Sequence, residues 1–268
     1  LMPWTGGHAQ QATNIVKVPG SANQYYIFSL TNNGVLYYSM IDMTLNNGMG
    51  GIVNGKKGIY LSHGYTEKMN VVVGCGNIWL VSRALQSNEY HAFEIRDTGI
   101  VSNPVVSAVG NLPLPWYRCG SIRFSADGGK MAAACNVGSH LASGLEIYDF
   151  DKVNGVVSNA QVLDSSSMGL RYYYGVCFSE DGSKLYASES SYVLSGFHEG
   201  KVRQFDVSLT NPTLISASNL IVYTEPIVLL NTVGDLQRAG DGKIYFSSAV
   251  NGIPIHAINN PNLAGLAC

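Results

Sequence analysis

The chain has 268 residues, of which only 13% are charged, together with 30 glycines and a formal net charge of −2. Such a composition argues against long charged helices, and the near-neutral charge gives no electrostatic reason to expect nucleic acid or an anionic membrane as a partner. No stretch approaches the roughly 20 uninterrupted apolar residues of a membrane span.

Strand-like runs separated by turns begin after residues 1–11, which show no strand pattern. A first group comprises Asn14–Val18, Gln24–Leu30, Val35–Asp42 and Gly58–Leu61. A second group comprises Met69–Val73, Ile78–Ser82, Tyr90–Arg96 and Val105–Val109. Apolar and polar residues alternate in these runs, which is typical of antiparallel strands with one buried face.

One pattern occurs twice between Arg118 and Ser208. Its first copy is Ile122–Asn136 followed by Leu145–Phe150, and its second copy is Val176–Ser190 followed by Val202–Val207. Each copy has an alternating run, an Asp-Gly turn, a second run, a polar loop and a third run. Outer strands are expected near Ala160–Leu163 and Leu214–Val222.

A third Asp-Gly turn introduces the last group of runs. Asp127, Asp181 and Asp241 are 54 and then 60 residues apart. The last group comprises Asp235–Arg238, Lys243–Ser248 and Ile253–Ile258, without a fourth strand. The Asp-Gly pairs satisfy turn geometry unaided and need no further chemistry.

These repeats predict an all-β fold, a β-propeller of four-stranded antiparallel blades with about five blades visible. A single blade cannot bury both of its faces, so copies at a period of roughly 40–55 residues must stack against one another. We expect residues 1–268 to form one propeller domain that lacks part of its first and last blades and belongs to a six- or seven-bladed ring.

The order of several motifs resembles a known family. The motifs are Asn14–Phe28, Leu36–Met43, Thr66–Met69, Phe178–Tyr186, Asp241–Tyr245 and Ile258–Asn262. Together they resemble the N-terminal β-propeller of the gliding-motility-associated, PKD-repeat surface proteins exported by type IX secretion, and the Phe-Ser-x-Asp-Gly hairpins are shared with WD40-like and YVTN-like propellers. The resemblance implies a secreted or cell-surface adhesion module joined to further domains, and it supplies no catalytic residues.

Strand parity predicts where ligands would bind. In a four-stranded blade, the loops between the second and third strands share a face with the crossovers between blades, and the Asp-Gly hairpins lie opposite. The candidate ligand-binding residues on this loop face are His63, Glu67, Trp116, Tyr117, Arg118, His140, Arg171, Tyr172, Tyr173, Tyr174, Tyr192, Phe197, His198 and Glu199. Their aromatic rings suit stacking on sugars or gripping a peptide; the alternative is that they pack between blades.

No catalytic or metal signature stands out. The chain lacks a Gly-x-Ser-x-Gly elbow, a His-Glu-x-x-His motif and a phosphate loop, its histidines do not fall at ligand spacing, and its five cysteines form no Cys-x-x-Cys pair. We therefore expect no cofactor, and a binding module for a glycan, peptide or protein. Two alternatives stay open: a metal-dependent lactonase or lyase-type propeller using Glu67, Glu225 and Asp235, and a purely structural spacer.

Overall fold

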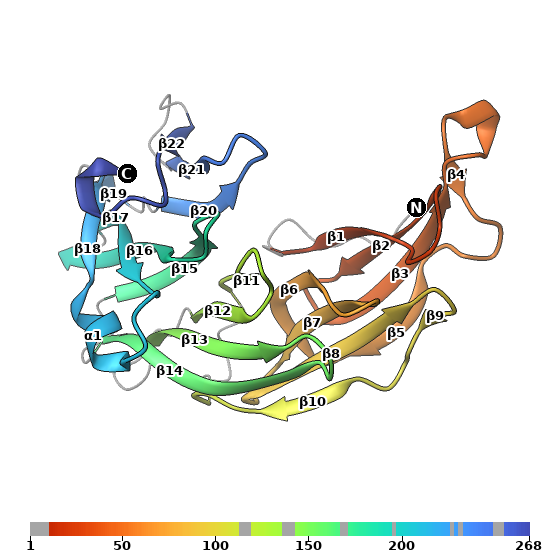
Figure 1. Cartoon of the computed structure of the whole chain (residues 1–268), viewed down its shortest axis with the longest axis horizontal. Helices are drawn as coiled ribbons and strands as arrows, with labels where there is room; N and C mark the ends of the chain where they lie inside the picture. The colour runs from red at the N-terminus through yellow and green to blue at the C-terminus, as the bar shows by residue number, and fades with distance from the viewer. Residues whose placement is uncertain are drawn as a thin grey trace. The chain divides into compact units, whose positions relative to one another are not determined.

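The computed structural model describes residues 11–112, 119–135, 143–166, 171–194, 197–225, 228–229, 233–248 and 255–268. These residues form five antiparallel sheets that follow one another in chain order (Figure 1). They group into two compact units: unit 1 comprises Leu1–Cys119 and Phe150–Ser158, and unit 2 comprises Gly120–Asp149 and Asn159–Cys268.

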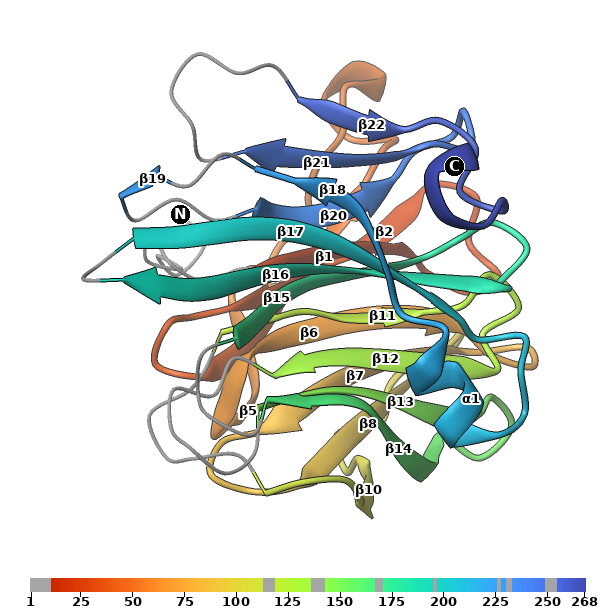
Figure 2. The ribbon, with the colours of Figure 1, turned by 90° about the vertical axis from the view of Figure 1, so that its left-hand side faces the viewer.

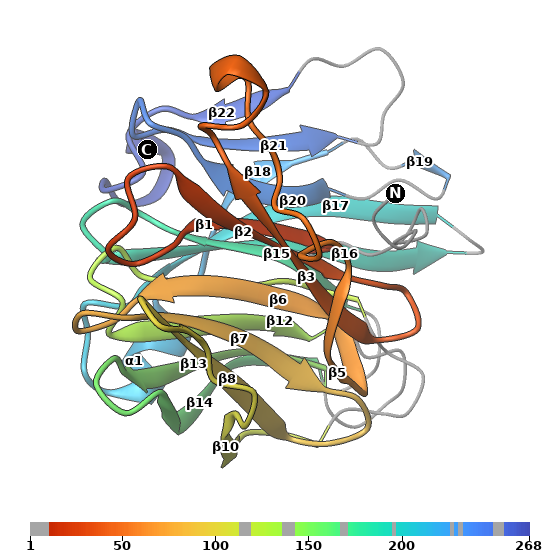
Figure 3. The same cartoon turned by 90° about the vertical axis from the view of Figure 1, so that its right-hand side faces the viewer.

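Unit 1 contains the first two sheets (Figure 3). The first has β1 (Thr13–Lys17), β2 (Gln24–Leu30) and β3 (Val35–Asp42), with β4 (Gly51–Ile52) and β5 (Ile59–His63) both paired to β3. The second has β6 (Tyr65–Val73), β7 (Ile78–Ala84) and β8 (Glu89–Arg96), with β9 (Gly99–Ile100) and β10 (Val105–Ala108) both paired to β8. In each sheet the first three strands are neighbours in chain order, and the last two share one partner strand.

Unit 2 contains the other three sheets (Figure 2). One has β11 (Ile122–Phe124), β12 (Lys130–Cys135), β13 (Ser143–Asp151) and β14 (Val156–Ser166). The turn between β13 and β14, within Phe150–Ser158, belongs to unit 1. The next has β15 (Arg171–Phe178), β16 (Lys184–Leu194), β17 (Phe197–Asp206) and β18 (Leu220–Thr224), with β19 (Val228–Leu229) paired to β17. The last has β20 (Val233–Arg238), β21 (Ile244–Ser248) and β22 (His256–Ile258).

The Asp-Gly turns close their hairpins with their own side chains. The Ser125 hydroxyl donates to Asp127 Oδ1 at 2.5 Å and accepts the backbone N–H of Lys130 at 3.0 Å, while Gly128 adopts φ +72°. The turn over 179–184 repeats these bonds at 2.7 and 2.9 Å. Each Asp carboxylate is thus used within its turn, and glycine supplies the left-handed conformation that the turn requires.

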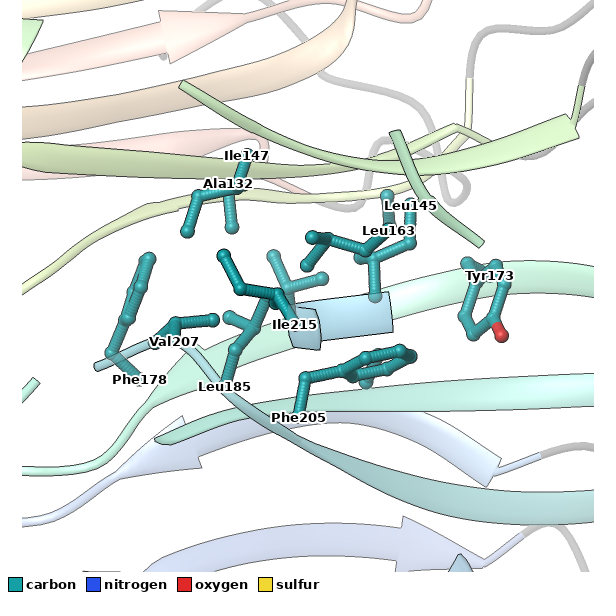
Figure 4. Close-up of a cluster of buried hydrophobic side chains, with 13 residues drawn as sticks. Ala132, Leu145, Ile147, Leu163, Tyr173, Phe178, Leu185, Phe205, Val207 and Ile215 are labelled. Atoms are coloured by element: carbon teal, nitrogen blue, oxygen red, sulfur yellow. The ribbon is translucent and has the colours of Figure 1, made fainter. Parts of the chain in front are cut away.

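Neighbouring sheets within each unit pack face to face. In unit 2, apolar side chains of β12, β13 and β14 meet those of β15, β16 and β17; Ala132, Ile147, Phe178, Leu185 and Phe205 are among them (Figure 4). Other buried clusters join the two sheets of unit 1 and the last two sheets of unit 2. Each large apolar side chain buried in this way contributes roughly 1.5–3 kcal/mol.

The expected outer strand near Leu214–Val222 is partly wrong. Residues Pro212–Ala217 form helix α1, and a strand begins only at Leu220. The helix begins because the Asn211 side chain accepts the N–H of Thr213 at 2.9 Å and Pro212 takes the first helical position, where its missing N–H costs nothing.

The fold is therefore all-β, a β-propeller type built from four-stranded antiparallel blades, as the sequence predicts. Within the described ranges, no helix has the length and apolarity needed to cross a membrane. A single domain over residues 1–268 and a six- or seven-bladed ring stay predictions.

Candidate functional site

Part of the predicted loop face lies outside the described residues. Trp116, Tyr117 and Arg118 fall in the range 113–118, and His140 falls in 136–142. For four others the strands are described but the side chains lie outside the description: Arg171 in β15, Tyr192 in β16, and Phe197 and His198 in β17. The site is built below from the other predicted residues and from the side chains around them.

In unit 1, the structure separates His63 from Glu67. His63 ends β5 in an exposed position, with its Nδ1 atom 2.7 Å from the Tyr60 hydroxyl. Glu67 is only 7% exposed, because the register of β6 against β7 shifts between Tyr65 and Met69 and turns consecutive residues inward. Glu67 therefore lies in the interior and not on an exposed loop.

Glu67 belongs to a buried polar cluster of unit 1. Beside it, the Lys68 ammonium donates to the Cys119 carbonyl oxygen at 2.5 Å. Burial, followed by the negative charge of Glu67, raises the pKa of the Cys119 thiol. The thiol consequently stays protonated at neutral pH, which does not suit a nucleophile.

Unit 2 holds a buried charged network around Tyr173, whose ring is 1% exposed and packs in the apolar core. The Tyr173 hydroxyl donates to Asp164 and lies 3.4 Å from Glu189 Oε2. Burial, followed by the charges of Glu189 and Asp164, raises the pKa of Tyr173 far above its usual value. Tyr173 was predicted to offer its ring to a ligand; strand alternation instead turns it into the interior.

Arg203 neutralises Glu189 in this network. The two side chains are 11% and 0% exposed, and the Arg203 guanidinium donates to both carboxylate oxygens of Glu189 and to Asn219 at 3.1 Å. The Ser191 hydroxyl also donates to Glu189. This network was not predicted. The sequence feature that could have indicated it is an acidic residue in one strand and a basic residue in the next, both at positions that the alternation of side chains along a strand directs into the interior.

Tyr172 and Tyr174 differ from Tyr173 in exposure. Both are half-buried, and the carbonyl oxygen of Tyr174 accepts the N–H of Ser121 at 2.9 Å. Among the predicted aromatic residues of unit 2 whose side chains are described, these two are partly accessible to solvent.

Glu225 is a buried carboxylate without a hydrogen-bond partner in the described part of the chain. It directly follows β18 and is 1% exposed, and neither of its carboxylate oxygens is hydrogen-bonded there. Its backbone N–H donates to the Gly200 carbonyl at 2.8 Å. A Cβ atom on Gly200 would lie 2.9 Å from Glu225 Oε2, so the glycine provides the space that the carboxylate occupies.

The surroundings of Glu225 supply no free cation among the described side chains. Near the start of strand β17, Glu199 pairs with Lys201 at 2.5 Å, so this lysine is already neutralised. Burial, followed by the charge of Glu225, raises the pKa of nearby Tyr223. Burying a polar group without a hydrogen-bond partner costs free energy, and such a group in a folded protein calls for an explanation.

Asp235, the other acid proposed for a lactonase-type site in this unit, is paired. Arg123 of β11 donates to Asp235 Oδ2 at 2.8 Å and to the Gln237 side chain at 3.2 Å. Gly175 of β15 allows this contact, since a Cβ atom there would lie 2.7 Å from Asp235 Oδ1. Among the described residues, no group of three or more His, Cys, Asp or Glu side chains is arranged to hold a metal ion.

The comparisons with known proteins bear on the fold. No family model matches the sequence, and no curated protein matches it. Solved structures similar to this chain include hydrazine synthase of Kuenenia stuttgartiensis (16% identity, 89% of this chain and 59% of that chain, TM-score 0.47) and the periplasmic gluconolactonase PpgL of Pseudomonas aeruginosa (13%, 92%, 67%, TM-score 0.50). A third is the GH43 protein BlXynB of Bacillus licheniformis (11%, 96%, 56%, TM-score 0.44).

The chain spans less than two thirds of the hydrazine synthase and BlXynB chains that it matches. At these identities, the likeness to the gluconolactonase supports the propeller fold and carries no activity with it.

Proposed function

We propose that this chain is a binding module of a larger secreted or cell-surface protein, and that its ligand is a peptide or glycan that presents a cationic or hydrogen-bond-donating group to Glu225. The observation that carries the proposal is the buried carboxylate of Glu225, which lacks a hydrogen-bond partner within the described residues. A bound ammonium, guanidinium or hydroxyl group would supply the missing donor.

The charge balance around Glu225 supports the same ligand chemistry. Counted together, the network around Tyr173 and the positions next to Glu225 hold four described acidic side chains and two basic ones: Asp164, Glu189, Glu199 and Glu225 against Lys201 and Arg203. Lys201 pairs with Glu199, and Arg203 pairs with Glu189. The described side chains thus leave negative charge in excess, which favours ligands that donate hydrogen bonds or carry positive charge.

Location and biological role rest on the sequence resemblance. The resemblance to the propeller of PKD-repeat surface proteins supports a secreted or cell-surface module with an adhesion role, export by type IX secretion, and further domains in the full-length protein. A ligand-binding propeller is consistent with that role, because loops on a rigid β scaffold commonly carry binding groups.

A lactonase-type enzyme is the second hypothesis. The observation that favours it is the fold, which is similar to that of a gluconolactonase. Of the three carboxylates that it would use, Asp235 is paired with Arg123 and Glu67 is buried in unit 1. Of these three carboxylates, Glu225 is the one whose oxygens both lack a hydrogen-bond partner within the described residues, so binding is the better-supported function.

The proposal can be tested by probing the purified 268-residue chain against glycan and peptide arrays, with and without a chelator, and by measuring the affinity of any hit calorimetrically. We expect binding that the chelator does not abolish and that is strongest for amine- or guanidinium-bearing probes. Chelator-sensitive hydrolysis of a lactone would support the enzyme and overturn the binding module.

The Glu225→Gln variant separates function from packing. Exchanging this unpaired buried carboxyl group for an amide should leave the free energy of unfolding unchanged or raise it by ~1 kcal/mol, while affinity for the array hit should fall at least about tenfold. The matched control is Glu180→Gln, at an exposed glutamate of the same unit, which should change neither property. If Glu225→Gln binds as tightly as the unmodified protein, the carboxylate is not the ligand contact.

A further inference from the structure

A hairpin of unit 1 holds several large apolar side chains out in solvent. It covers residues 43–58, between β3 and β5, and includes the 3-10 turn η1 (Asn46–Gly48) and β4 (Figure 1; Figure 3). Met49 is 80% exposed, and Met43, Leu45 and Ile52 are 39–41% exposed. We call these four side chains the apolar tip.

The apolar tip is an ordered turn whose conformation is fixed by hydrogen bonds. The Leu45 carbonyl accepts the N–H groups of Gly48 at 3.2 Å and Gly50 at 3.0 Å, and the Asn46 side chain donates to the Gly50 carbonyl at 2.9 Å. Asn46 and Asn47 adopt φ +52° and +57°, a conformation that non-glycine residues seldom adopt. The backbone thus holds Leu45 and Met49 in water instead of letting the loop collapse onto the sheet.

The charges of the hairpin have one sign. Residues 43–58 contain Lys56 and Lys57, both exposed, and no Asp or Glu, whereas the whole chain carries a net charge of −2. The acid at the base of the hairpin, Asp42, is hydrogen-bonded to Thr44 and Gln24. Lys56 and Lys57 lie in the connection from β4 to β5, where the Lys56 carbonyl accepts the N–H of Met40 at 2.9 Å. Exposed apolar side chains and lysines in one connection suit an anionic lipid surface, which offers acyl chains and charged headgroups.

We propose that the apolar tip docks unit 1 onto an anionic lipid surface, with Met49 and Leu45 entering the headgroup–acyl boundary and Lys56 and Lys57 contacting lipid phosphates. The near-neutral charge of the whole chain gives no reason to expect a membrane partner. The reason comes from residues 43–58, which combine exposed apolar side chains with two lysines and no acidic residue. The docking is independent of the ligand site at Glu225, which lies in unit 2.

Sedimentation with lipid vesicles tests this docking on the full 268-residue chain. We expect the protein to pellet with phosphatidylcholine vesicles that contain phosphatidylglycerol, and much less with phosphatidylcholine alone or at high salt, because salt screens the lysine contribution. The double variant Leu45→Ser/Met49→Ser and the double variant Lys56→Glu/Lys57→Glu should each bind at least about tenfold more weakly.

Two variants of unit 1 serve as controls. Val73→Ser removes an exposed apolar side chain elsewhere (71% exposed), and Lys17→Glu reverses an exposed lysine elsewhere; both should bind as the unmodified protein does. The docking is overturned if no vesicle composition pellets the protein, or if the tip variants bind normally. It is also overturned if the tip variants abolish a dimer seen by light scattering while vesicle binding is absent, since the tip would then contact a second copy.

Discussion

Arg203 and Glu189 illustrate how much depends on single side chains in the interior of unit 2. Their ion pair is almost completely buried, so removing either partner leaves an uncompensated charge away from water. The same physical rule makes Glu225 noteworthy, since it lacks within the described residues the partner that Glu189 has.

Arg203→Met should therefore lower the free energy of unfolding by ~3–5 kcal/mol, because it leaves the buried Glu189 carboxylate without its cationic partner. Urea denaturation followed by circular dichroism measures the loss. Arg96→Met is the control: Arg96 pairs with Glu94 at 2.5 Å but is 55% exposed, and its loss should have little effect. A change of equal size in both variants would show that burial of the pair is not the cause.

Tyr173 should make the protein sensitive to alkali. Its pKa is raised in the folded state by burial and by neighbouring carboxylates, so above about pH 10 the unfolded chain loses a proton that the native protein keeps. Stability is thus fully present below pH 10 and falls with increasing pH, by up to ~1.4 kcal/mol per pH unit for this group. Urea midpoints between pH 8 and 11 should fall less steeply in Tyr173→Phe.

At the scale of elements, the hairpin between β13 and β14 depends on a close contact with β7 within unit 1. The Trp79 indole N–H donates to the Lys152 carbonyl at 2.8 Å, and Gly155 (φ +70°) lies directly against the Trp79 ring. A Cβ atom on Gly155 would come within 2.5 Å of that ring. The position therefore tolerates only glycine.

Gly155→Ala should destabilise unit 1 by ~2–4 kcal/mol, through overpacking against the ring and through the positive φ angle. Gly76→Ala is the matched control, because Gly76 has a similar φ of +85° but open space around its Cβ position, and it should cost only ~1 kcal/mol. Chemical denaturation monitored by tryptophan fluorescence compares the two variants; equal losses would mean that the contact with Trp79 contributes nothing.

The hairpins could be predicted from the sequence because their determinants are local. Alternation and Asp-Gly turns place the strands of the first repeat copy within a few residues of their observed bounds. In the second copy the predicted polar loop between Ser190 and Val202 is wrong, because β16 continues to Leu194 and β17 already begins at Phe197. The apolar tip and α1 were not predicted, because neither shows alternation over enough residues. The start of α1 was nevertheless marked by Asn211 and Pro212.

The site was less predictable because it depends on register. Glu225 could be identified as an acid following a strand, but its burial beside Gly200 depends on how β17 and β18 pair. The partnership of Glu189 with Arg203 depends likewise on the pairing of β16 with β17. The Glu67 side chain points into the interior because of a register shift between β6 and β7, and no pattern of residues in the sequence predicts this shift.

For the whole molecule, aspartates in both units predict acid lability. Hydrogen bonds hold the pKa of several of them below the usual value; in Asp206, burial raises the pKa, but bonds from Ser208 and Lys184 outweigh it. Such groups stabilise the fold above the pKa of the unfolded chain, about 4, and this stabilisation is lost as the pH falls through the lower folded value.

We therefore expect urea midpoints that are constant near neutral pH and fall below about pH 4. Asp206→Asn should be less stable than the unmodified protein at pH 7 and should lose less stability on acidification. Stability that is independent of pH between 7 and 2 would contradict the contribution of these carboxylates.

Because the Ser-x-Asp-Gly turns complete their hydrogen bonds within six residues, each of these hairpins can form before any sheet meets its neighbour. Hairpins of this kind form in roughly 1–10 μs, far faster than contacts between distant segments. These hairpins are therefore suited to form first, as local folding nuclei, while the chain is still being synthesised on the ribosome. Residues inserted at the opposite ends of the strands should slow the packing of one sheet against the next and leave the formation of these hairpins unchanged.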